Sequence, residues 1–169
     1  MDRRLASLAA AAAVVLLDRL TKSLIKTHFS AWDNFTVIPG IFNIVHTENP
    51  GIAFGLLADA SNYWWRGVVL IGFSISVLIA VSAMLLRPAS VAALSGLLRT
   101  GLSLVLGGAA GNLYDRIVNG TVTDFVEVHA GPYYFPAFNV ADSAIFIGAC
   151  LLLLDMWRSR ERKSETADI

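Results

Sequence analysis

Long apolar stretches separated by polar connections dominate the pattern of this sequence. A membrane-spanning helix needs about 20 consecutive, mostly apolar residues, and four stretches approach this length, at about 5–25, 67–86, 94–114 and 137–157. The stretch 67–86 has no charged residue, whereas each of the other three contains at least one. We therefore predict an all-α membrane protein with four transmembrane helices, folded as a single integral membrane domain over residues 1–169.

The N-terminal stretch allows a second interpretation. Two arginines precede an alanine-rich run, which is also the pattern of a cleavable signal peptide. The run ends in Asp18-Arg19, however, and lacks the small residues of a cleavage site. We therefore favour an uncleaved first helix.

Two connections contain patterns typical of β-strands. The first, at 26–66, holds two β-prone runs at 35–38 and 41–46, joined by Pro39-Gly40, which is a hairpin signal. The second, at 115–136, has the turn Asn119-Gly120 followed by a β-prone run at 121–128. We predict a small β-hairpin, or cradle, formed by these connections on one face of the membrane.

Lysine and arginine positions predict the orientation. With four spans both termini lie on one side, and the larger share of positive charge falls there and in the loop after the second span. Those residues are Arg3, Arg4, Arg87, Arg99, Arg158, Arg160, Arg162 and Lys163. Because cytoplasmic loops are enriched in such residues, both termini are predicted to be cytoplasmic and segments 26–66 and 115–136 to face outward.

Composition excludes several classes of function. The chain is 56% hydrophobic with a formal net charge of zero, so it offers no basic footprint for nucleic acid. Its single cysteine excludes an intramolecular disulfide and a multi-cysteine metal site. No His-Glu-x-x-His motif occurs and the three histidines are scattered. We expect no metal and no cofactor.

Two aspartates are the candidates for catalysis. Asp142 falls about one turn into the fourth predicted span, and Asp124 lies on the outer strand before it. Two carboxylates held close together share one proton, so one can activate water while the other protonates a scissile carbonyl. Structural roles are open for both: Asn139 and Asp142 have the spacing of a capping box, and Asp124 fits a solvated strand position.

Polar residues near the outer end of the third span form a second candidate group. Asn112 and Arg116 are four residues apart and share a helix face, with Asp115 beside them. They could orient the two acids or a substrate backbone. The alternative is an interfacial ion pair that finishes the helix, with Arg116 reaching water.

Two further spacings favour helix packing. Asp18 and Lys22 are one turn apart in the first span, which predicts a structural ion pair that anchors this helix. Gly107 and Gly111 form a small-xxx-small face, which is typical of closely packed membrane helices.

Five sequence boxes, in order along the chain, resemble those of the lipoprotein signal peptidases, also called signal peptidase II. They are Asp18-x-x-Thr21-Lys22, Asn49-Pro-Gly51-Ile-Ala53-Phe54, Gly107–Arg116, Val122-Thr-Asp124-Phe125 and Phe138-Asn139-Val-Ala141-Asp142-Ser143. One departure is Arg19, which stands where the family often has glutamine.

The resemblance implies a catalytic dyad of Asp124 and Asp142. It further implies that supporting residues orient the dyad or hold the substrate, namely Asn49, Gly51, Asn112, Arg116, Asn139, Asp115, Asp18 and Lys22. The family removes the signal peptide from diacylglyceryl-modified prolipoproteins, just before the lipidated cysteine, and the peptide antibiotic globomycin blocks it. The expected location is the bacterial inner membrane, among membrane lipids, with the active site at the outer face. We also expect the segment 59–65 to act as a lid.

Two other classes of function use similar residues. A small transporter or proton relay also has intramembrane acids, but it predicts acids spread through the bilayer instead of clustered at one face. A non-catalytic assembly subunit predicts that replacing both aspartates leaves function intact.

Overall fold

The computed structural model describes residues 2–31, 33–51 and 63–167, and these form five helices and a four-stranded sheet. The helices are α1 (Arg3–His28), α2 (Tyr63–Leu86), α3 (Pro88–Ala93), α4 (Gly96–Val118) and α5 (Val140–Ala167). The strands are β1 (Asn34–Ile38), β2 (Phe42–Asn49), β3 (Val122–Ala130) and β4 (Tyr133–Tyr134). The protein is therefore mostly helical with a small antiparallel sheet.

The four predicted apolar stretches all fall on long helices. The largest difference is in α5, which continues to Ala167, ten residues beyond the predicted end. The short α3 was not predicted; proline fits its first turn because that position needs no N–H donor. Polar caps start two of the long helices: Asp2 accepts from the Arg4 amide, and Ser95 accepts from the Leu98 amide.

The sheet combines the two predicted outer segments. Its strand order is β1-β2-β3-β4 and all neighbours are antiparallel. The predicted hairpin is confirmed as β1 and β2, with Gly40 at φ +80° in the turn. Gly120, at φ +76°, makes the turn before β3, as the Asn119-Gly120 dipeptide predicts. The pairing of β3 with β2 joins two segments that are far apart in the sequence.

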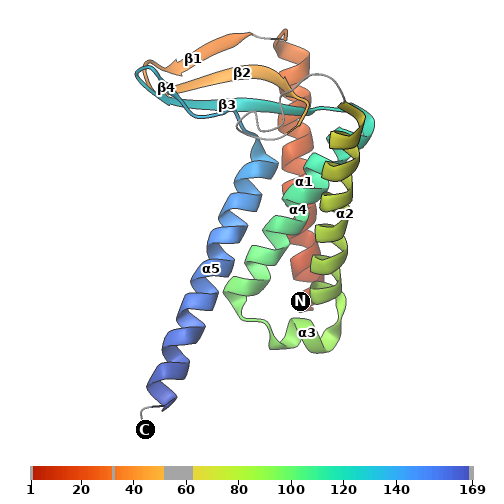
Figure 1. Ribbon diagram of the computed structural model, residues 1–169, viewed down its shortest axis with the longest axis vertical. Helices are drawn as coiled ribbons and strands as arrows, with labels where there is room; N and C mark the ends of the chain where they lie inside the picture. Colours follow the sequence, from red (N-terminus) through yellow and green to blue (C-terminus); the bar gives the residue numbers. More distant parts are fainter. Residues whose placement is uncertain (1, 32, 52–62, 168–169) are drawn as a thin grey trace.

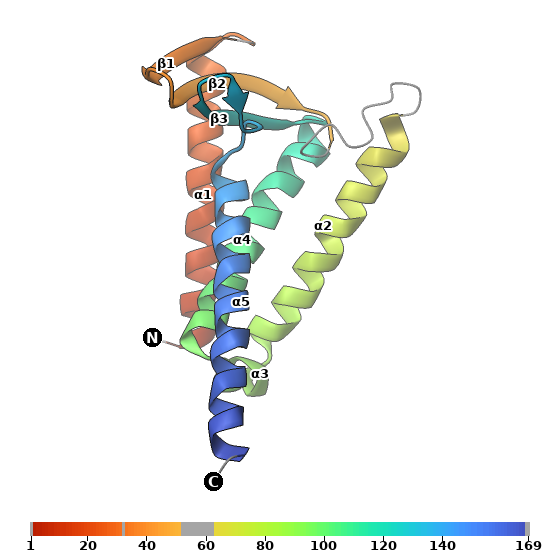
Figure 2. The ribbon, with the colours of Figure 1, turned by 60° about the vertical axis from the view of Figure 1, so that its left-hand side comes forward.

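The helix α4 is the centre of the bundle, packed against α1, α2 and α5 (Figures 1 and 2). Glycines allow the close approach: a Cβ at Gly107 would lie 2.6 Å from the carbonyl oxygen of Ala11 in α1. Gly101 and Gly148 face each other between α4 and α5, where each would place a Cβ within 3 Å of the other's carbonyl oxygen. A Cβ on Gly111 would lie 2.7 Å from Asp18 Oδ2 of α1, so the predicted close packing of the Gly107 and Gly111 face is confirmed.

Many apolar side chains on the helices face outward. Examples on four helices are Leu16, Leu20, Phe73, Ile79, Ile117, Phe146 and Leu153. Within the described residues, two helices have windows long and apolar enough to cross a membrane, at 67–86 and 140–160. Helices α1 and α4 contain more polar residues. Two of these, Lys22 and Asn112, are buried.

The sheet lies across one end of the bundle, and both chain ends lie at the other (Figure 1). The described strands of both predicted outer segments therefore lie at the same end of the bundle. This arrangement also brings β3 over the start of α5, which is where the candidate site forms.

Candidate active site

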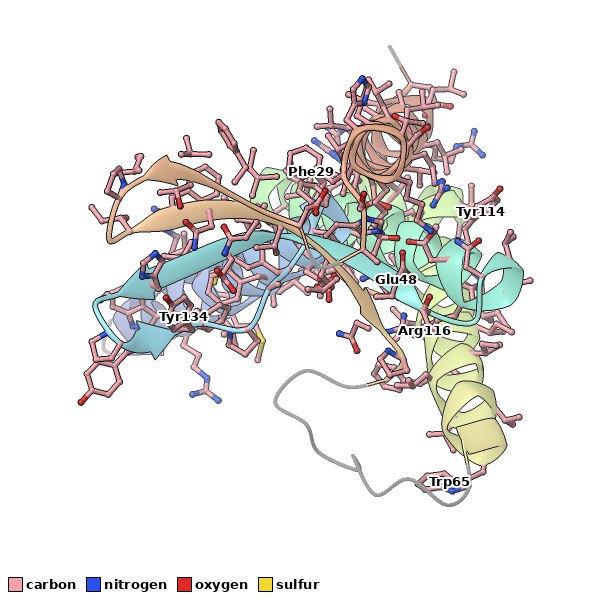
Figure 3. The ribbon with its side chains drawn as sticks, turned by 90° about the horizontal axis from the view of Figure 1, so that it is seen from above. Phe29, Glu48, Trp65, Tyr114, Arg116 and Tyr134 are labelled. Atoms are coloured by element: carbon pink, nitrogen blue, oxygen red, sulfur yellow. The ribbon has the colours of Figure 1, made fainter. Side chains whose placement is uncertain are left out.

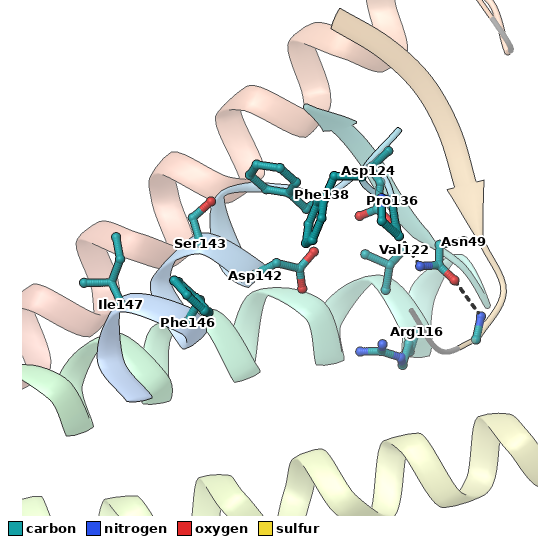
Figure 4. Close-up of a pocket in the computed structure, with 13 residues that line it drawn as sticks. Asn49, Arg116, Val122, Asp124, Pro136, Phe138, Asp142, Ser143, Phe146 and Ile147 are labelled. Carbon is teal, nitrogen blue, oxygen red and sulfur yellow. Dashed lines mark hydrogen bonds between the residues drawn. The ribbon is translucent and has the colours of Figure 1, made fainter. Parts of the chain in front are cut away.

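A pocket of about 530 Å³ lies between the sheet and the facing ends of α4 and α5, and it contains both candidate aspartates (Figure 4). Asp124 comes from β3 and Asp142 from the first turn of α5. Arg116 of α4 lines the same pocket. The fold therefore brings together three residues that the sequence spreads over 27 positions.

Asp124 is almost fully buried and is held from two sides. Its Oδ2 accepts a hydrogen bond from Asn49 Nδ2 at 3.0 Å, and its Oδ1 accepts one from Asn139 Nδ2 at 2.7 Å. Thr47 donates to its backbone carbonyl at 3.2 Å. The alternative of a solvated strand residue is excluded, because Asp124 is only 3% exposed.

Asp142 takes part in the predicted capping box. Its backbone amide donates to Asn139 Oδ1 at 2.9 Å, and Asn139's backbone amide donates to Asp142 Oδ2 at 3.3 Å. Its Oδ1 accepts from Asn112 Nδ2 at 2.7 Å while the carboxyl group faces the pocket. Capping and a role in the pocket are therefore compatible for this residue.

Two asparagines connect the aspartates. Asn139 Nδ2 lies 3.3 Å from Asn112 Oδ1, so one amide contacts Asp124 and the other contacts Asp142. The ammonium of Lys22 donates to Asn112 Oδ1 at 3.1 Å. Since this oxygen accepts from Lys22, the amide nitrogen of Asn112 is directed toward Asp142.

Lys22 is the centre of a buried charge cluster behind the pocket. Its Nζ lies 2.8 Å from Asp18 Oδ2 and 2.8 Å from Asp115 Oδ2, and all three side chains are fully buried. The predicted Asp18–Lys22 pair is confirmed. Asp18 also accepts from the amide of Ala141 at 3.0 Å, so a residue of α1 caps the start of α5.

The side chains of Asp115 and Arg116 point in different directions. Instead of finishing α4 as an interfacial pair, Asp115 turns toward α1, where Arg19 and Lys22 both contact it. Arg116 is half-buried, faces the pocket, and donates to the backbone carbonyl of Asn112 at 3.3 Å. The contact of Arg19 with Asp115 was not predicted from the sequence. The only sign of a role for Arg19 was that it stands where the family often has glutamine. Its guanidinium also lies 4.3 Å from the centre of the Tyr114 ring.

Two residues of the second sequence box belong to the pocket wall. Asn49 and Gly51 both line it, and the Gly51 amide donates to Asn49 Oδ1 at 3.0 Å. This bond directs the Asn49 amide nitrogen toward Asp124. The rest of the box, together with most of the segment expected to be a lid, lies outside the described residues; Tyr63 to Trp65 begin α2.

The electrostatics of the pocket favour a shared proton. Burial raises the pKa of Asp124 to about 7, with the nearby negative charge of Asp142 adding to the rise and the hydrogen bond from Asn49 opposing it. Asp142 lies at a helix N-terminus, where the helix dipole stabilises a negative charge. The two acids therefore have the different environments that general acid–base chemistry requires.

Apart from Ser143, the remaining pocket wall is apolar. It is formed by Val122, Phe135, Pro136, Ala137, Phe138, Phe146 and Ile147. Phe146 and Ile147 are 71% and 50% exposed on the outer surface of α5, so the pocket extends to that surface. Within the described residues, no group of three or more His, Cys, Asp or Glu side chains could hold a metal ion.

Comparisons with known proteins give one consistent result. A family model described as signal peptidase (SPase) II matches residues 10–158. The chain is 43% identical to a lipoprotein signal peptidase of Solibacter usitatus over 166 residues, covering 98% of this chain and 99% of that protein. It is 43% identical to a lipoprotein signal peptidase of Pseudomonas aeruginosa over 150 residues, covering 88% and 85% of the two chains.

Solved structures agree with this result. A bacterial membrane enzyme solved by the in meso method at 2.3 Å resolution has a TM-score of 0.80 and 32% identity, covering 94% of this chain and 91% of that one. A second, at 1.9 Å resolution, has a TM-score of 0.76 and 31% identity, covering 89% and 92%. With a family match over most of the chain, close relatives across nearly its whole length and the same fold, this chain belongs to the signal peptidase II family.

Proposed function

We propose that this protein is a membrane-embedded aspartic endopeptidase that removes the signal peptide from diacylglyceryl-modified prolipoproteins, cutting just before the lipidated cysteine. Membership of the signal peptidase II family supports this activity and substrate class. The observation that carries the mechanism is the pair Asp124 and Asp142, which line one pocket and are bridged by two asparagine amides.

The two acids take complementary roles. Asp142, as the carboxylate, removes a proton from water while the water oxygen attacks the scissile carbonyl carbon. Asp124, which keeps its proton up to about neutral pH, gives that proton to the carbonyl oxygen. When the tetrahedral diol collapses, Asp142 passes its new proton to the leaving amine and a diol hydroxyl returns a proton to Asp124. Both acids end in their starting states.

The supporting residues set the positions of these acids. Asn49, Asn139 and Asn112 hold the carboxylates through hydrogen bonds. Arg116 supplies a positive charge at the pocket wall, suited to a substrate backbone carbonyl. Asp18 and Lys22 act from behind the pocket: Asp18 fixes the start of α5, and Lys22 fixes Asn112.

Four helices, α1, α2, α4 and α5, cross the membrane in this proposal, as one membrane domain with both termini in the cytoplasm. The charged residues of α1 that would oppose insertion face α4, where Lys22 pairs with Asp18 and Asp115 and Arg19 also pairs with Asp115, so that the four charges balance. The sheet then lies on the outer face, and the pocket opens along α5 toward the lipid, where a lipidated substrate resides. The location is the bacterial inner membrane, and globomycin is the expected inhibitor.

The test is incubation of the purified protein with a diacylated prolipoprotein, followed by mass measurement of the products. The expected products are an intact signal peptide and a mature chain that begins with the lipidated cysteine. A matched precursor without the diacylglyceryl group should be cut far more slowly, since it lacks the membrane anchor that presents the bond to the pocket. Equal rates on both precursors would show that the lipid is not recognised.

A further inference from the structure

A polar cluster centred on Glu48 lies on the face of the sheet opposite Asp124. Glu48 Oε2 accepts a hydrogen bond from Thr121 Oγ1 at 2.6 Å, and its Oε1 accepts one from Thr123 Oγ1 at 3.1 Å. The same Oε1 lies 3.2 Å from His46 Nε2 and 3.4 Å from the ammonium of Lys26. One carboxylate thus joins three parts of the chain: α1, β2 and the start of β3.

The register of the sheet places this cluster directly behind the candidate active site. Glu48 pairs with Thr123, and its neighbour Thr47 pairs with Asp124. Because successive side chains on a strand point to opposite faces, Glu48 and Thr123 share one face while Asp124 shares the other with Asn49. Both neighbours of Glu48 contact Asp124: the Thr47 hydroxyl donates to the backbone carbonyl of Asp124, and the Asn49 amide donates to the carboxylate of Asp124.

The cluster also connects this strand pair to α1. His46 Nδ1 lies 2.9 Å from the backbone carbonyl of Phe29, just after α1 ends, and Lys26 belongs to its last turn. Viewed from above, Glu48 lies between the ends of α1 and α4 (Figure 3). The helix α1 carries Asp18, which caps the start of α5 and so holds the helix of Asp142.

Glu48 is charged at neutral pH. Burial raises the pKa of this carboxyl, but hydrogen bonds from Thr121 and His46 and the charge of Lys26 outweigh burial and leave the pKa below its usual value. A carboxylate with four polar partners is a firm cross-link, because hydrogen bonds to a charged group are stronger than those between neutral groups. The cross-link therefore operates across the pH range in which Asp124 changes its protonation.

We infer that Glu48 is a positioning residue for the peptidase reaction: it fixes the β2–β3 strand pair to α1 and thereby sets the position of Asp124 relative to Asp142. The inference rests on the proposed function. Glu48 touches neither substrate nor reacting atoms, since it faces away from the pocket. Its effect should thus fall on the chemical step and leave substrate binding intact, because misplacement of a catalytic group by about 1 Å can cost up to about a hundredfold in rate.

The test compares Glu48→Gln with Glu127→Gln on a diacylated precursor. Glu127 is a matched control on the same strand pair. Its carboxylate accepts a hydrogen bond from Asn43 Nδ2 at 2.8 Å, and it lies three residues along β3 from Asp124. Glu48→Gln should lower kcat about tenfold with KM within about twofold, in line with a small displacement of a catalytic group. Glu127→Gln should match the wild-type protein. An unchanged kcat in Glu48→Gln, or an equal loss in both variants, would overturn the inference.

A second pair of variants separates positioning from general destabilisation. Thr121→Val keeps the size of the side chain but removes the hydroxyl donor, whereas Thr121→Ser keeps the donor. We expect Thr121→Val to lower kcat at unchanged KM and Thr121→Ser to retain wild-type kcat. Equal kcat in both variants would contradict the inference. If the wild-type protein itself leaves the precursor uncut, the proposed function fails, and the inference falls with it.

Discussion

Asp124 and Asp142 have the same side chain but different surroundings. Asp124 lies buried on β3, where burial disfavours its charge. Asp142 lies in the first turn of α5, where its carboxylate accepts a capping hydrogen bond from the Asn139 amide. We therefore give the proton to Asp124 in the proposed mechanism. The sequence could not indicate this, because the burial of Asp124 depends on residues distant in the chain.

The assignment predicts the pH dependence of activity. With a pKa of about 7, Asp124 loses its proton as the pH rises through neutrality, so the general acid disappears and kcat should fall. The measurement is kcat on a diacylated precursor between about pH 5 and 9. A kcat that continues to rise well above neutrality would assign the proton to another group.

The same pKa predicts a pH dependence of stability. A pKa raised from 3.8 to about 7 in the folded state means that the folded protein binds the proton more tightly than the unfolded chain. The stability that this proton contributes is fully present below the pKa of the unfolded chain and is lost as the pH rises to about 7. Asp124→Asn lacks this dependence, so its melting temperature relative to wild type should increase over that range. A constant difference would contradict the raised pKa.

At the scale of elements, the contact between α4 and α5 sets the position of Asp142. A Cβ on Gly108 of α4 would overlap the backbone carbonyl of Ala141, the residue before Asp142. Backbone cannot move aside as a flexible side chain can, so Gly108→Ala should push the two helices apart.

Gly108→Ala should therefore lower both stability, by about 1–3 kcal/mol, and cleavage rate. Gly72→Ala is the matched control, since a Cβ on this helical glycine of α2 meets nothing within 4 Å. The two measurements are the melting temperature and the rate on a diacylated precursor. Similar behaviour of the two variants would mean that this helix contact does not position the site.

Local signals predicted the elements better than their partners. The hairpin of β1 and β2 follows from Pro39-Gly40 between β-prone runs, and the cap of α5 follows from the spacing of Asn139 and Asp142. The sequence could not show that β3 would pair with β2, because pairing between strands more than 70 residues apart leaves no local pattern. It could not show that Asp115 turns to Lys22 and Arg19 for the same reason.

At the scale of the whole molecule, the sheet lies at one end of the bundle and both termini lie at the other (Figure 1). If the helices span the membrane, both termini lie on one side of it and the sheet on the other; that the side of the termini is the cytoplasm is the prediction from the lysine and arginine distribution. The arrangement also clusters the two candidate acids at one end, beside the sheet, whereas a transporter or proton relay predicts acids distributed along the bilayer.

The orientation can be tested with reporter fusions. A reporter fused after Ile169 should be active only in its cytoplasmic form, because both ends are proposed to lie inside. A reporter inserted at Gly131, in the exposed turn between β3 and β4, should be active only in its external form. An externally active fusion at Ile169 would falsify the four-span arrangement.

The central claim is that Asp124 and Asp142 act as one catalytic unit. The most direct test measures the cleavage rate of a diacylated precursor beside the melting temperature for Asp124→Asn, Asp142→Asn and the double variant. Each single change should lower the rate by about a hundredfold or more, and the double variant should be hardly slower, because residues that act as a unit are not additive. If Asp142 were only a helix cap, its replacement would cost about 1 kcal/mol of stability and spare turnover. A variant that melts early yet cuts at a near-normal rate would remove that aspartate from the mechanism.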